Sequence, residues 1–276
     1  FRLVGSEMCI RDRIRTMSLM PTGHVMDNGL SDDNRQRYAR HLVLPSVGEE
    51  GQIKLLKSSV LVVGAGGLGS PAMLYLAAAG VGRIGIIDDD FVEESNLQRQ
   101  IIHSTSSIGD AKAESAAERL RLLNPGIVVT PIVNRLTESN ALSVIKDYDI
   151  VIDGTDNFAS RYLIGDVCEI LGKTWIFGSI HRFEGQVSTF NFQDGPNYRD
   201  LFPSAPPPEL APNCSEAGVL GVLPGIIGTI QATEAIKVIL GIGEVMSGKL
   251  LTIDSLKMIT RVLSFDTNPG RSRGSG

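Results

Sequence analysis

Residues 59–90, SVLVVGAGGLGSPAMLYLAAAGVGRIGIIDDD, determine the fold that we expect for the whole chain. Apolar residues lead into the glycine turn 64–69, an alanine- and leucine-rich helical segment follows, and a second apolar strand ends at Asp88. Glycines let the backbone turn tightly beside phosphate oxygens, and the start of the next helix offers free N–H groups and the positive end of a dipole. An acid that ends the second strand can accept hydrogen bonds from a ribose. The stretch therefore predicts a nucleotide site but does not say which nucleotide.

The alternation of strands and helices continues beyond this stretch. The sequence patterns predict further helices at 34–42, 52–57, 111–123, 140–145 and 157–171, and strands at 127–132, 150–152 and 174–178. Strands that alternate with helices in this way predict an α/β fold with a doubly wound, mostly parallel, Rossmann-like sheet.

The last third of the chain changes character. Residues 186–192 alternate like a strand with one solvent-facing side, and 195–213 are proline-rich and read as a crossing loop without helix. A mainly buried helix is expected within 218–240, and two closing strands at 250–253 and 258–263. We expect these last strands to extend the sheet in antiparallel fashion.

The composition is that of an ordinary globular protein. The 276 residues are 42% hydrophobic and carry a formal net charge of −5, so no basic excess indicates a nucleic-acid partner. The most apolar run, 217–242, is interrupted by Pro224, glycines and charged residues, which argues against a membrane span. The three cysteines, at unrelated spacings, offer no disulfide framework and favour a reducing, cytoplasmic location.

The chain divides into one domain and three short segments. Residues 1–16, which begin FRLVGSEMCIRDR, resemble a translated sequencing adapter, so we expect no function for Cys9. Residues 17–30 read as a flexible N-terminus, 31–270 as a single catalytic domain, and 271–276 as a tail.

Polar residues follow the strands at the places where a doubly wound sheet binds its ligands. Besides the glycine turn and Asp88, the strand at 150–152 runs into the polar cluster 153–157, and Arg99 and Lys112 can fold over the same crevice. Cations suit a polyphosphate, while carboxylates suit a ribose and a hydrated Mg²⁺. A nicotinamide cofactor needs no magnesium and no such pair of cations, so the pattern favours ATP over NAD. Lys112 opposes the dipole of its own helix, which indicates a compensating ligand phosphate.

Several longer strings carry a family resemblance. They are GAGGLGS (64–70), IDDDFVEESNLQRQ (87–100), GDAKAESA (109–116) and DGTDNFASRY (153–162), with RYARHLVLP (37–45) and GVLGVLPGIIGTIQATEAIK (218–237). Together they resemble the ubiquitin-activating-type adenylyltransferases of the MoeB/ThiF/HesA family, nearest to the molybdopterin-synthase branch, over about 31–270. The resemblance implies that ATP activates the C-terminal Gly-Gly carboxylate of a ubiquitin-like, MoaD/ThiS-like sulfur carrier, with release of pyrophosphate.

The resemblance also implies roles for single residues. Those expected to bind ATP are Gly64, Gly66, Gly67, Gly69, Asp88, Ser95, Asn96, Leu97, Gln98, Arg99, Lys112, Asp156 and Asn157. Among them Gly67 backs the phosphates, Lys112 meets the phosphate under attack, and Asp156 holds Mg²⁺. Arg40 matches an arginine that reaches into the ATP site of the partner subunit, which implies a homodimer with shared sites.

Cysteine positions separate the branches of this family. Cys214 matches a cysteine that in relatives forms a thioester or persulfide link to the carrier, and it can equally be an inert loop thiol. Cys168 reads as core. The zinc-binding CxxC pairs of many members are missing, since 197–200 read NYRD and no second pair follows, so we expect no zinc. Members with this pattern often carry a C-terminal rhodanese domain, which is either missing here or was cut off, so a separate rhodanese or cysteine desulfurase is one expected sulfur donor.

The sequence leaves several alternatives open. An ATP-dependent dehydratase of the same superfamily that modifies a tRNA base would fit the motifs, although the acidic charge argues against it. A scaffold that holds a carrier without activating it, and an NAD oxidoreductase, are weaker alternatives. Molybdopterin synthesis is the pathway that we expect, while thiamine, cysteine and tRNA-thiolation routes use similar enzymes. The histidines His41, His103 and His181 lack metal spacing and are expected to have no catalytic role.

Overall fold

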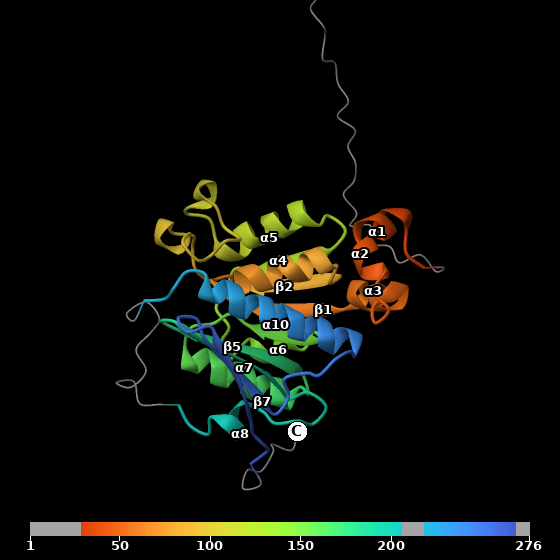
Figure 1. Cartoon of the computed structure of the whole chain (residues 1–276). Helices are drawn as coiled ribbons and strands as arrows, with labels where there is room; N and C mark the ends of the chain where they lie inside the picture. Colours follow the sequence, from red (N-terminus) through yellow and green to blue (C-terminus); the bar gives the residue numbers. More distant parts are fainter. Residues whose placement is uncertain (1–28, 206–217, 269–276) are drawn as a thin grey trace, which may run out of the picture.

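The computed structural model describes residues 29–205 and 218–268. Predictions for 1–28, 206–217 and 269–276, which include the adapter-like segment, Cys9 and Cys214, lie outside the described residues. Figure 1 shows a central twisted sheet with helices on both faces. The sheet has eight strands in the order β3-β2-β1-β4-β5-β6-β7-β8.

The strands agree closely with those that the apolar runs predict. Their bounds are β1 Ser59–Val63, β2 Arg83–Ile87, β3 Val128–Ile132, β4 Ile150–Asp153, β5 Thr174–His181, β6 Glu184–Phe190, β7 Lys249–Asp254 and β8 Ile259–Ser264. The neighbours among β1 to β5 pair in parallel, and β6 to β8 continue the sheet in antiparallel fashion. The prediction of a doubly wound, mostly parallel sheet with an antiparallel C-terminal extension is confirmed.

The α-helices follow the order expected for this topology. Their bounds are α1 Asp32–Arg37, α2 Ala39–Leu42, α3 Gly48–Lys57, α4 Gly69–Ala79, α5 Lys112–Leu123, α6 Ala141–Ile145, α7 Phe158–Ile170, α8 Tyr198–Leu201 and α10 Leu223–Leu240. Two 3₁₀ turns, η1 Glu94–Asn96 and η2 Thr105–Ser107, lie between β2 and α5.

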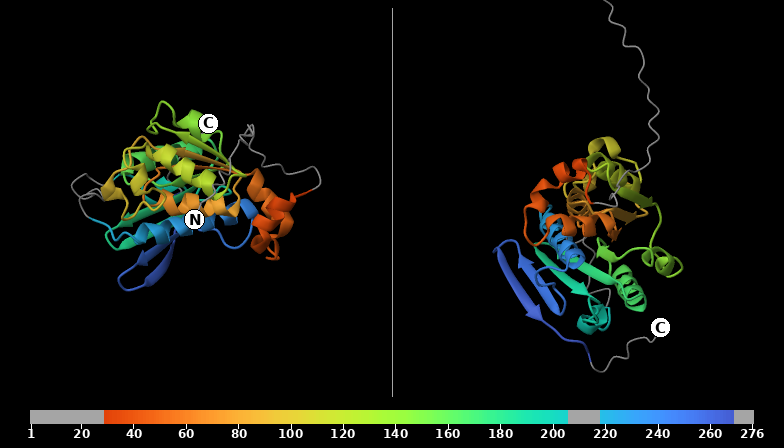
Figure 2. Two further views of the ribbon diagram at one scale, coloured as in Figure 1. Left: turned by 90° about the horizontal axis from the view of Figure 1, so that it is seen from above. Right: turned by 90° about the vertical axis from the view of Figure 1, so that its right-hand side faces the viewer.

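Each central strand buries both of its faces, because side chains alternate across the sheet. In β1, Val60 and Val62 pack into a core with side chains of α4, α5 and α10. Leu61 and Val63 point the other way, into a core shared with α6 and α7. The views of Figure 1 and Figure 2 agree with these two layers of helices around one sheet.

Three local predictions need correction. The helix predicted at 34–42 is two short helices, which break at Tyr38, where the buried ring packs directly under Gly80. The strand β6 has no wet face along most of its length, because Ser188 and Thr189 are fully buried between the layers. The proline-rich loop contains a helical turn, α8, which Asn197 caps.

The long helix α10 forms much of the core beside the later strands. By length and composition it is the one helix of the described residues that could cross a membrane. Half of its apolar window is buried inside the protein, where it packs on α4, β5 and β6. Its apolar character is that of a core helix.

The strand order places a crevice at one edge of the sheet. The chain runs from β1 outward to β2 and β3, then crosses back to β4 on the other side of β1. The loops that follow β1 and β4 therefore diverge at the carboxyl ends of these strands, which is where open α/β sheets bind ligands.

Candidate functional site

A cavity of about 520 Å³ lies at this switch point. Eight of the residues predicted to bind the nucleotide line it: Gly64, Gly66, Gly67, Asp88, Arg99, Lys112, Asp156 and Asn157. They come from four separate segments, which follow β1, β2 and β4 or begin α5. The fold thus brings the glycine turn, two cations and two acids to one cavity, as the sequence predicted.

The glycine turn is held closely against the loop after β4. Gly64 has φ 97°, and a Cβ placed there would lie 2.8 Å from the carbonyl oxygen of Gly154. Only glycine tolerates both the left-handed backbone and this approach. The next helix, α4, begins without a side-chain cap. Its first turn offers few donors to an anion, because the Ser70 N–H donates to the Gly66 carbonyl at 2.9 Å and Pro71 has no N–H.

Asp88 connects the end of β2 to this turn. Its Oδ2 accepts a hydrogen bond from the Ala65 N–H at 2.7 Å, and its Oδ1 accepts one from the Asp90 N–H at 2.8 Å. Burial raises the pKa of this carboxyl above its usual value, and the two backbone hydrogen bonds oppose that rise. Each carboxylate oxygen has a second lone pair, so both remain able to accept ribose hydroxyls.

Two cations line the cavity, Arg99 from the segment after β2 and Lys112 from the start of α5. The Lys112 ammonium lies 3.0 Å from the Asp90 carboxylate, and its side chain is only 9% exposed. This ion pair offsets the unfavourable position of Lys112 at the start of α5, where the sequence had suggested a ligand phosphate instead. Arg99 is half-buried and donates to the carbonyl of Ser95 at 3.1 Å, which leaves other guanidinium donors for a ligand.

The loop after β4 is held by a buried ion pair. Asp153 is fully buried, and its Oδ1 accepts from both the N–H and the hydroxyl of Thr155, at 2.8 and 2.6 Å. Its Oδ2 lies 3.5 Å from the Nε of Arg161 as an ion pair, and the Nη2 of the same guanidinium donates to the Thr155 carbonyl at 3.2 Å. Burial raises the pKa of Asp153 to about 6, although the Arg161 charge opposes this. These contacts fix the backbone from which Asp156 projects.

Asp156 and Asn157 differ in how the fold uses them. Asp156 is exposed at the cavity wall. The side chain of Asn157 caps α7, since its Oδ1 accepts the Ser160 N–H at 2.9 Å. No group of three or more acidic, histidine or cysteine side chains able to hold a metal is present within 29–205 and 218–268. A magnesium ion carried by substrate phosphates needs only one or two protein carboxylates, which fits a lone Asp156.

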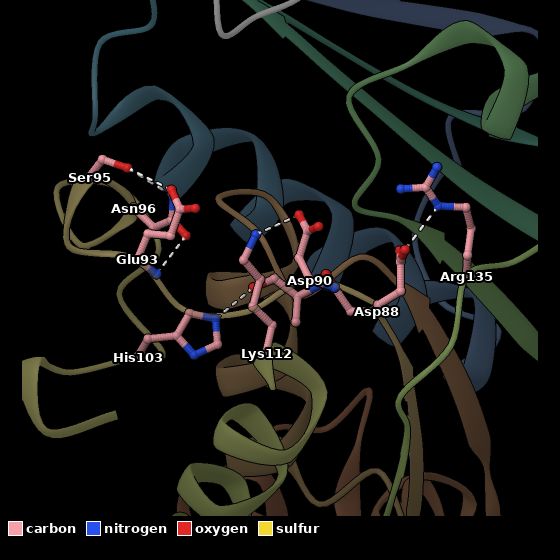
Figure 3. A network of polar contacts seen from close by, with 10 residues as sticks. Asp88, Asp90, Glu93, Ser95, Asn96, His103, Lys112 and Arg135 are labelled. Carbon is pink, nitrogen blue, oxygen red and sulfur yellow. Dashed lines mark hydrogen bonds and ion pairs between the residues drawn. The ribbon is translucent and has the colours of Figure 1, made fainter. Parts of the chain in front are cut away.

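Some residues predicted to bind ATP lie outside the cavity wall. Ser95 and Asn96 belong to η1, where Asn96 and Glu93 form a reciprocal capping box, as the left side of Figure 3 shows. Gln98 packs against Gly221, and Leu97 is half-buried. Gly69 is the first residue of α4 and packs on the Gly64 carbonyl. The structure brings none of these to the wall, and their contacts with ATP stay predictions.

Arg40 lies in the N-terminal helices and not at the cavity wall of its own chain. It is an exposed residue of α2. Figure 1 and the left view of Figure 2 place α1 to α3 at one end of the molecule and the segment with η1 and η2 at the other. Arg40 is not among the residues that line the cavity.

The sequence interpretation did not assign roles to three residues of this region. Asp90 pairs with Lys112, Arg161 pairs with Asp153, and His103 is buried behind the glycine turn. Arg161 could have been found from the sequence, because it follows the predicted site residue Asn157 by four positions and so lies on the same face of the helix. His103 and Asp90 carry no local signal, since their partners are distant along the chain. Cys168 is confirmed as core: it is 1% exposed, and burial raises the pKa of its thiol.

Comparison with known families finds one match that spans most of the chain. Residues 38–272 match the ThiF family. The "Probable adenylyltransferase/sulfurtransferase MoeZ" of Mycobacterium tuberculosis (strain CDC 1551 / Oshkosh) is 49% identical over 247 residues, which cover 88% of this chain. The chain spans 63% of the length of that relative.

Two further comparisons concern a shorter relative and a solved structure. The "Sulfur carrier protein adenylyltransferase" of Thermus thermophilus is 49% identical over 238 residues, which cover 84% of this chain and 88% of the relative. The crystal structure of E. coli MccB with ATP has a TM-score of 0.75 at 22% identity, and the match covers 86% of this chain and 74% of MccB. At that identity the structural likeness concerns the fold.

Proposed function

This chain belongs to the ThiF family, and we propose that it uses ATP to adenylate the C-terminal Gly-Gly carboxylate of a ubiquitin-like sulfur-carrier protein. The observation that carries the proposal is the convergence of Arg99, Lys112, Asp88 and Asp156 around the glycine turn in one cavity. Two cations are what a triphosphate needs, and a nicotinamide cofactor would not use them. The name of the Thermus thermophilus relative supports the carrier as the substrate.

The cavity has a part suited to each portion of ATP. Asp88 would accept the ribose hydroxyls, and the apolar wall formed by Val63, Ile87, Leu136 and Leu163 would take the base. The glycine turn, of which Gly64, Gly66 and Gly67 line the cavity, would face the phosphates. Asp156 would hold Mg²⁺, which neutralises phosphate charge when bound.

The reaction asks the protein for positioning and charge neutralisation. A carboxylate oxygen of the carrier attacks the α-phosphorus, a new O–P bond forms, the bond to the β-phosphate oxygen breaks, and pyrophosphate leaves with its electron pair. Arg99 and Lys112 would stabilise the charge that moves onto the phosphate oxygens, as fixed cations do in phosphoryl transfer. No covalent intermediate on the protein is needed for this step.

The place of Arg40 supports a homodimer with shared sites. The helix α2, which carries Arg40, lies at one end of the molecule (Figure 1), and Arg40 does not line its own cavity, so it would act at such a site in a second copy. Exposed apolar residues follow it directly, with Val43 72% and Leu44 49% exposed. A two-fold symmetric contact would place each Arg40 beside the partner's cavity and bury these residues at the same time.

Later steps of the pathway extend the proposal. The acyl-adenylate would be handed to a sulfur donor, a separate rhodanese or cysteine desulfurase, with or without a covalent link through Cys214. We place the protein in the cytoplasm, because Cys168 is a free buried thiol and the cysteine pattern offers no disulfide framework. Molybdopterin synthesis is the pathway that we propose for the carrier.

A direct test incubates the protein with ATP, Mg²⁺ and purified carriers and measures the carrier mass. We expect the mass of one AMP on a carrier that ends in Gly-Gly and none on the same carrier without its last glycine. The carrier that reacts identifies the pathway. A tRNA base modified in place of any carrier would instead support the dehydratase, and tighter binding of NAD than of ATP in calorimetry would support an oxidoreductase.

A further inference from the structure

His103 joins the glycine turn to the helix that carries Lys112. The ring is 8% exposed, and its Nε2 lies 2.9 Å from the carbonyl oxygen of Ala65 in the middle of the turn. Its Nδ1 lies 2.9 Å from the hydroxyl of Ser115, in the first turn of α5. Figure 3 shows the ring beside the Lys112 side chain, to its left.

The two contacts fix the tautomer of the ring. A carbonyl oxygen only accepts, so Nε2 carries the proton and donates to Ala65. The Nδ1 atom then accepts from the Ser115 hydroxyl when the ring is neutral. Burial lowers the pKa of His103 below its usual value, which agrees with a neutral imidazole.

The contact at Ala65 also orients the next peptide group. In a planar trans peptide, the carbonyl of Ala65 and the N–H of Gly66 point in opposite directions. The His103 bond draws the carbonyl to the rear of the turn, so the Gly66 N–H points away from the imidazole. Gly66 lines the cavity. The imidazole therefore aims a donor of the turn at the proposed phosphate site.

These bonds belong to a closed ring of interactions. Asp88 accepts from the N–H groups of Ala65 and Asp90, and the Asp90 carbonyl in turn accepts from the Lys112 N–H at 2.9 Å. Helix α5 joins Lys112 to Ser115, and His103 returns the path to Ala65. Asp88, the glycine turn and Lys112 are therefore linked in one closed series of hydrogen bonds and helix backbone. The imidazole is the side chain that bridges turn and helix in this circuit.

We propose that His103 is a positioning residue, which sets the spacing between the Gly66 N–H and the Lys112 ammonium through its bonds to Ala65 and Ser115. This inference rests on the proposed function. His103 is not among the residues that line the cavity, so its effect passes through the turn and α5. A displacement of about 1 Å in such groups can cost on the order of 100-fold in rate.

The test compares variants in carrier-dependent exchange of pyrophosphate into ATP, with ATP affinity measured separately by calorimetry. His103→Phe keeps a ring but removes both bonds, and we expect kcat to fall on the order of 30-fold while the Kd for ATP changes less than about 5-fold. His103→Gln keeps an amide N–H that can reach Ala65, so it should recover most of the rate. Ser115→Ala breaks only the link to α5 and should lower kcat about 3- to 10-fold, which also serves if His103→Phe does not fold.

The matched control is Thr189→Val, which removes another buried hydrogen bond, from Thr189 to Glu234, between residues that do not line the cavity. It should lower the Tm without changing kcat. Equal kcat values for wild type, His103→Phe and Ser115→Ala, or no recovery with Gln, would overturn the inference.

If the proposed function itself is wrong, the exchange assay gives a different result. Wild-type protein would then show no exchange with any carrier. NMR would still report the tautomer of His103 and its contact with Ser115. The ¹⁵N shifts should show His103 protonated at Nε2, with the Nδ1 shift altered by Ser115→Ala.

Discussion

The ammonium nitrogen of Lys112 lies 3.0 Å from a carboxylate oxygen of Asp90, two residues beyond the acid expected to hold the ribose. The two partners differ in environment, since the Lys112 side chain is 9% exposed and that of Asp90 is 64% exposed. The lysine is therefore held in place by the fold, whereas the carboxylate can turn to solvent. An arriving phosphate can take its position without moving the ammonium.

Removal of that carboxylate should strengthen ATP binding. In Asp90→Asn the backbone hydrogen bonds of residue 90 remain, but Lys112 no longer has to give up an ion pair with a carboxylate when it binds a phosphate of ATP. We expect the Kd for ATP to fall about 2- to 5-fold, because an ion pair with one exposed partner contributes roughly 0.2–1 kcal/mol. Calorimetry at fixed salt measures it. The control is Asp89→Asn, which removes an equal charge from a pair with Arg135. Weaker binding in Asp90→Asn than in wild type would contradict this account.

The shared-site dimer predicts complementation between two inactive variants. Arg40→Ala and Asp156→Ala should each be inactive alone. In a mixed dimer, the cavity with an intact Asp156 receives Arg40 from the other subunit. Statistical mixing makes half of the dimers mixed, each with one complete site, so about a quarter of wild-type activity should return. Subunits are mixed, equilibrated and assayed for pyrophosphate exchange. No recovery in a sample whose mixed dimers are demonstrated by mass spectrometry would exclude sharing.

The buried Asp153 should make stability depend on pH. Its pKa is about 6 in the folded protein and 3.8 without the fold. Between these values the folded state keeps a proton that the unfolded chain has lost, so the free energy of unfolding falls as pH rises from about 4 to about 6. A rise of about two pKa units corresponds to roughly 3 kcal/mol.

Urea denaturation of wild type and Asp153→Asn at several pH values tests this dependence. Asparagine still accepts the bonds from Thr155 but does not titrate. The stability of wild type relative to Asp153→Asn should therefore decline between pH 4 and pH 6 and stay constant above. A relative stability that rises over this range has the wrong sign for the proposed burial effect.

The close approach of the glycine turn to the β4 loop should make Gly64 irreplaceable. Gly64 and Gly109 both have positive φ, at 97° and 93°, but only at Gly64 would a Cβ meet backbone, the Gly154 carbonyl. Alanine at either position should carry a similar backbone strain. Gly64→Ala should cost about 1–3 kcal/mol more than Gly109→Ala, and it should also weaken ATP binding. Thermal unfolding compares the two, and equal losses would show that the approach is unimportant.

The sequence predicted the fold because its signals are local. Apolar runs of strand length, a glycine turn and helical segments recur in order, and each central strand was found within a few residues of its observed bounds. The break at Tyr38 could not be foreseen from the local sequence. The Tyr38 ring packs against Gly80, which ends α4 and is distant in the sequence. The wet face expected for β6 was wrong for a similar reason, since α10 and the aromatic cluster around Trp175 cover both of its sides.

The residues of the candidate site likewise differ in whether a local sequence signal predicts them. Residues directly after strands, such as Asp88 and Asp156, were predictable because parallel strands deliver their carboxyl ends to one edge. Pairs of residues that are distant in the sequence and meet only in the folded protein were not predictable. Asp90 lies 22 residues from Lys112, and His103 lies 38 residues from Ala65. Residues 95–98 show the converse, since they belong to a string that carries the family resemblance but do not line the cavity.

The central claim is that this cavity activates a carrier carboxylate with ATP. Carrier-dependent exchange of radiolabelled pyrophosphate into ATP measures that step alone, before any sulfur transfer. The wild-type protein should exchange label only when a Gly-Gly carrier is present, and Asp156→Ala or Arg99→Ala should lower the rate on the order of 100-fold. Exchange that persists in Asp156→Ala, or wild-type protein that exchanges no label with any Gly-Gly carrier, would contradict it.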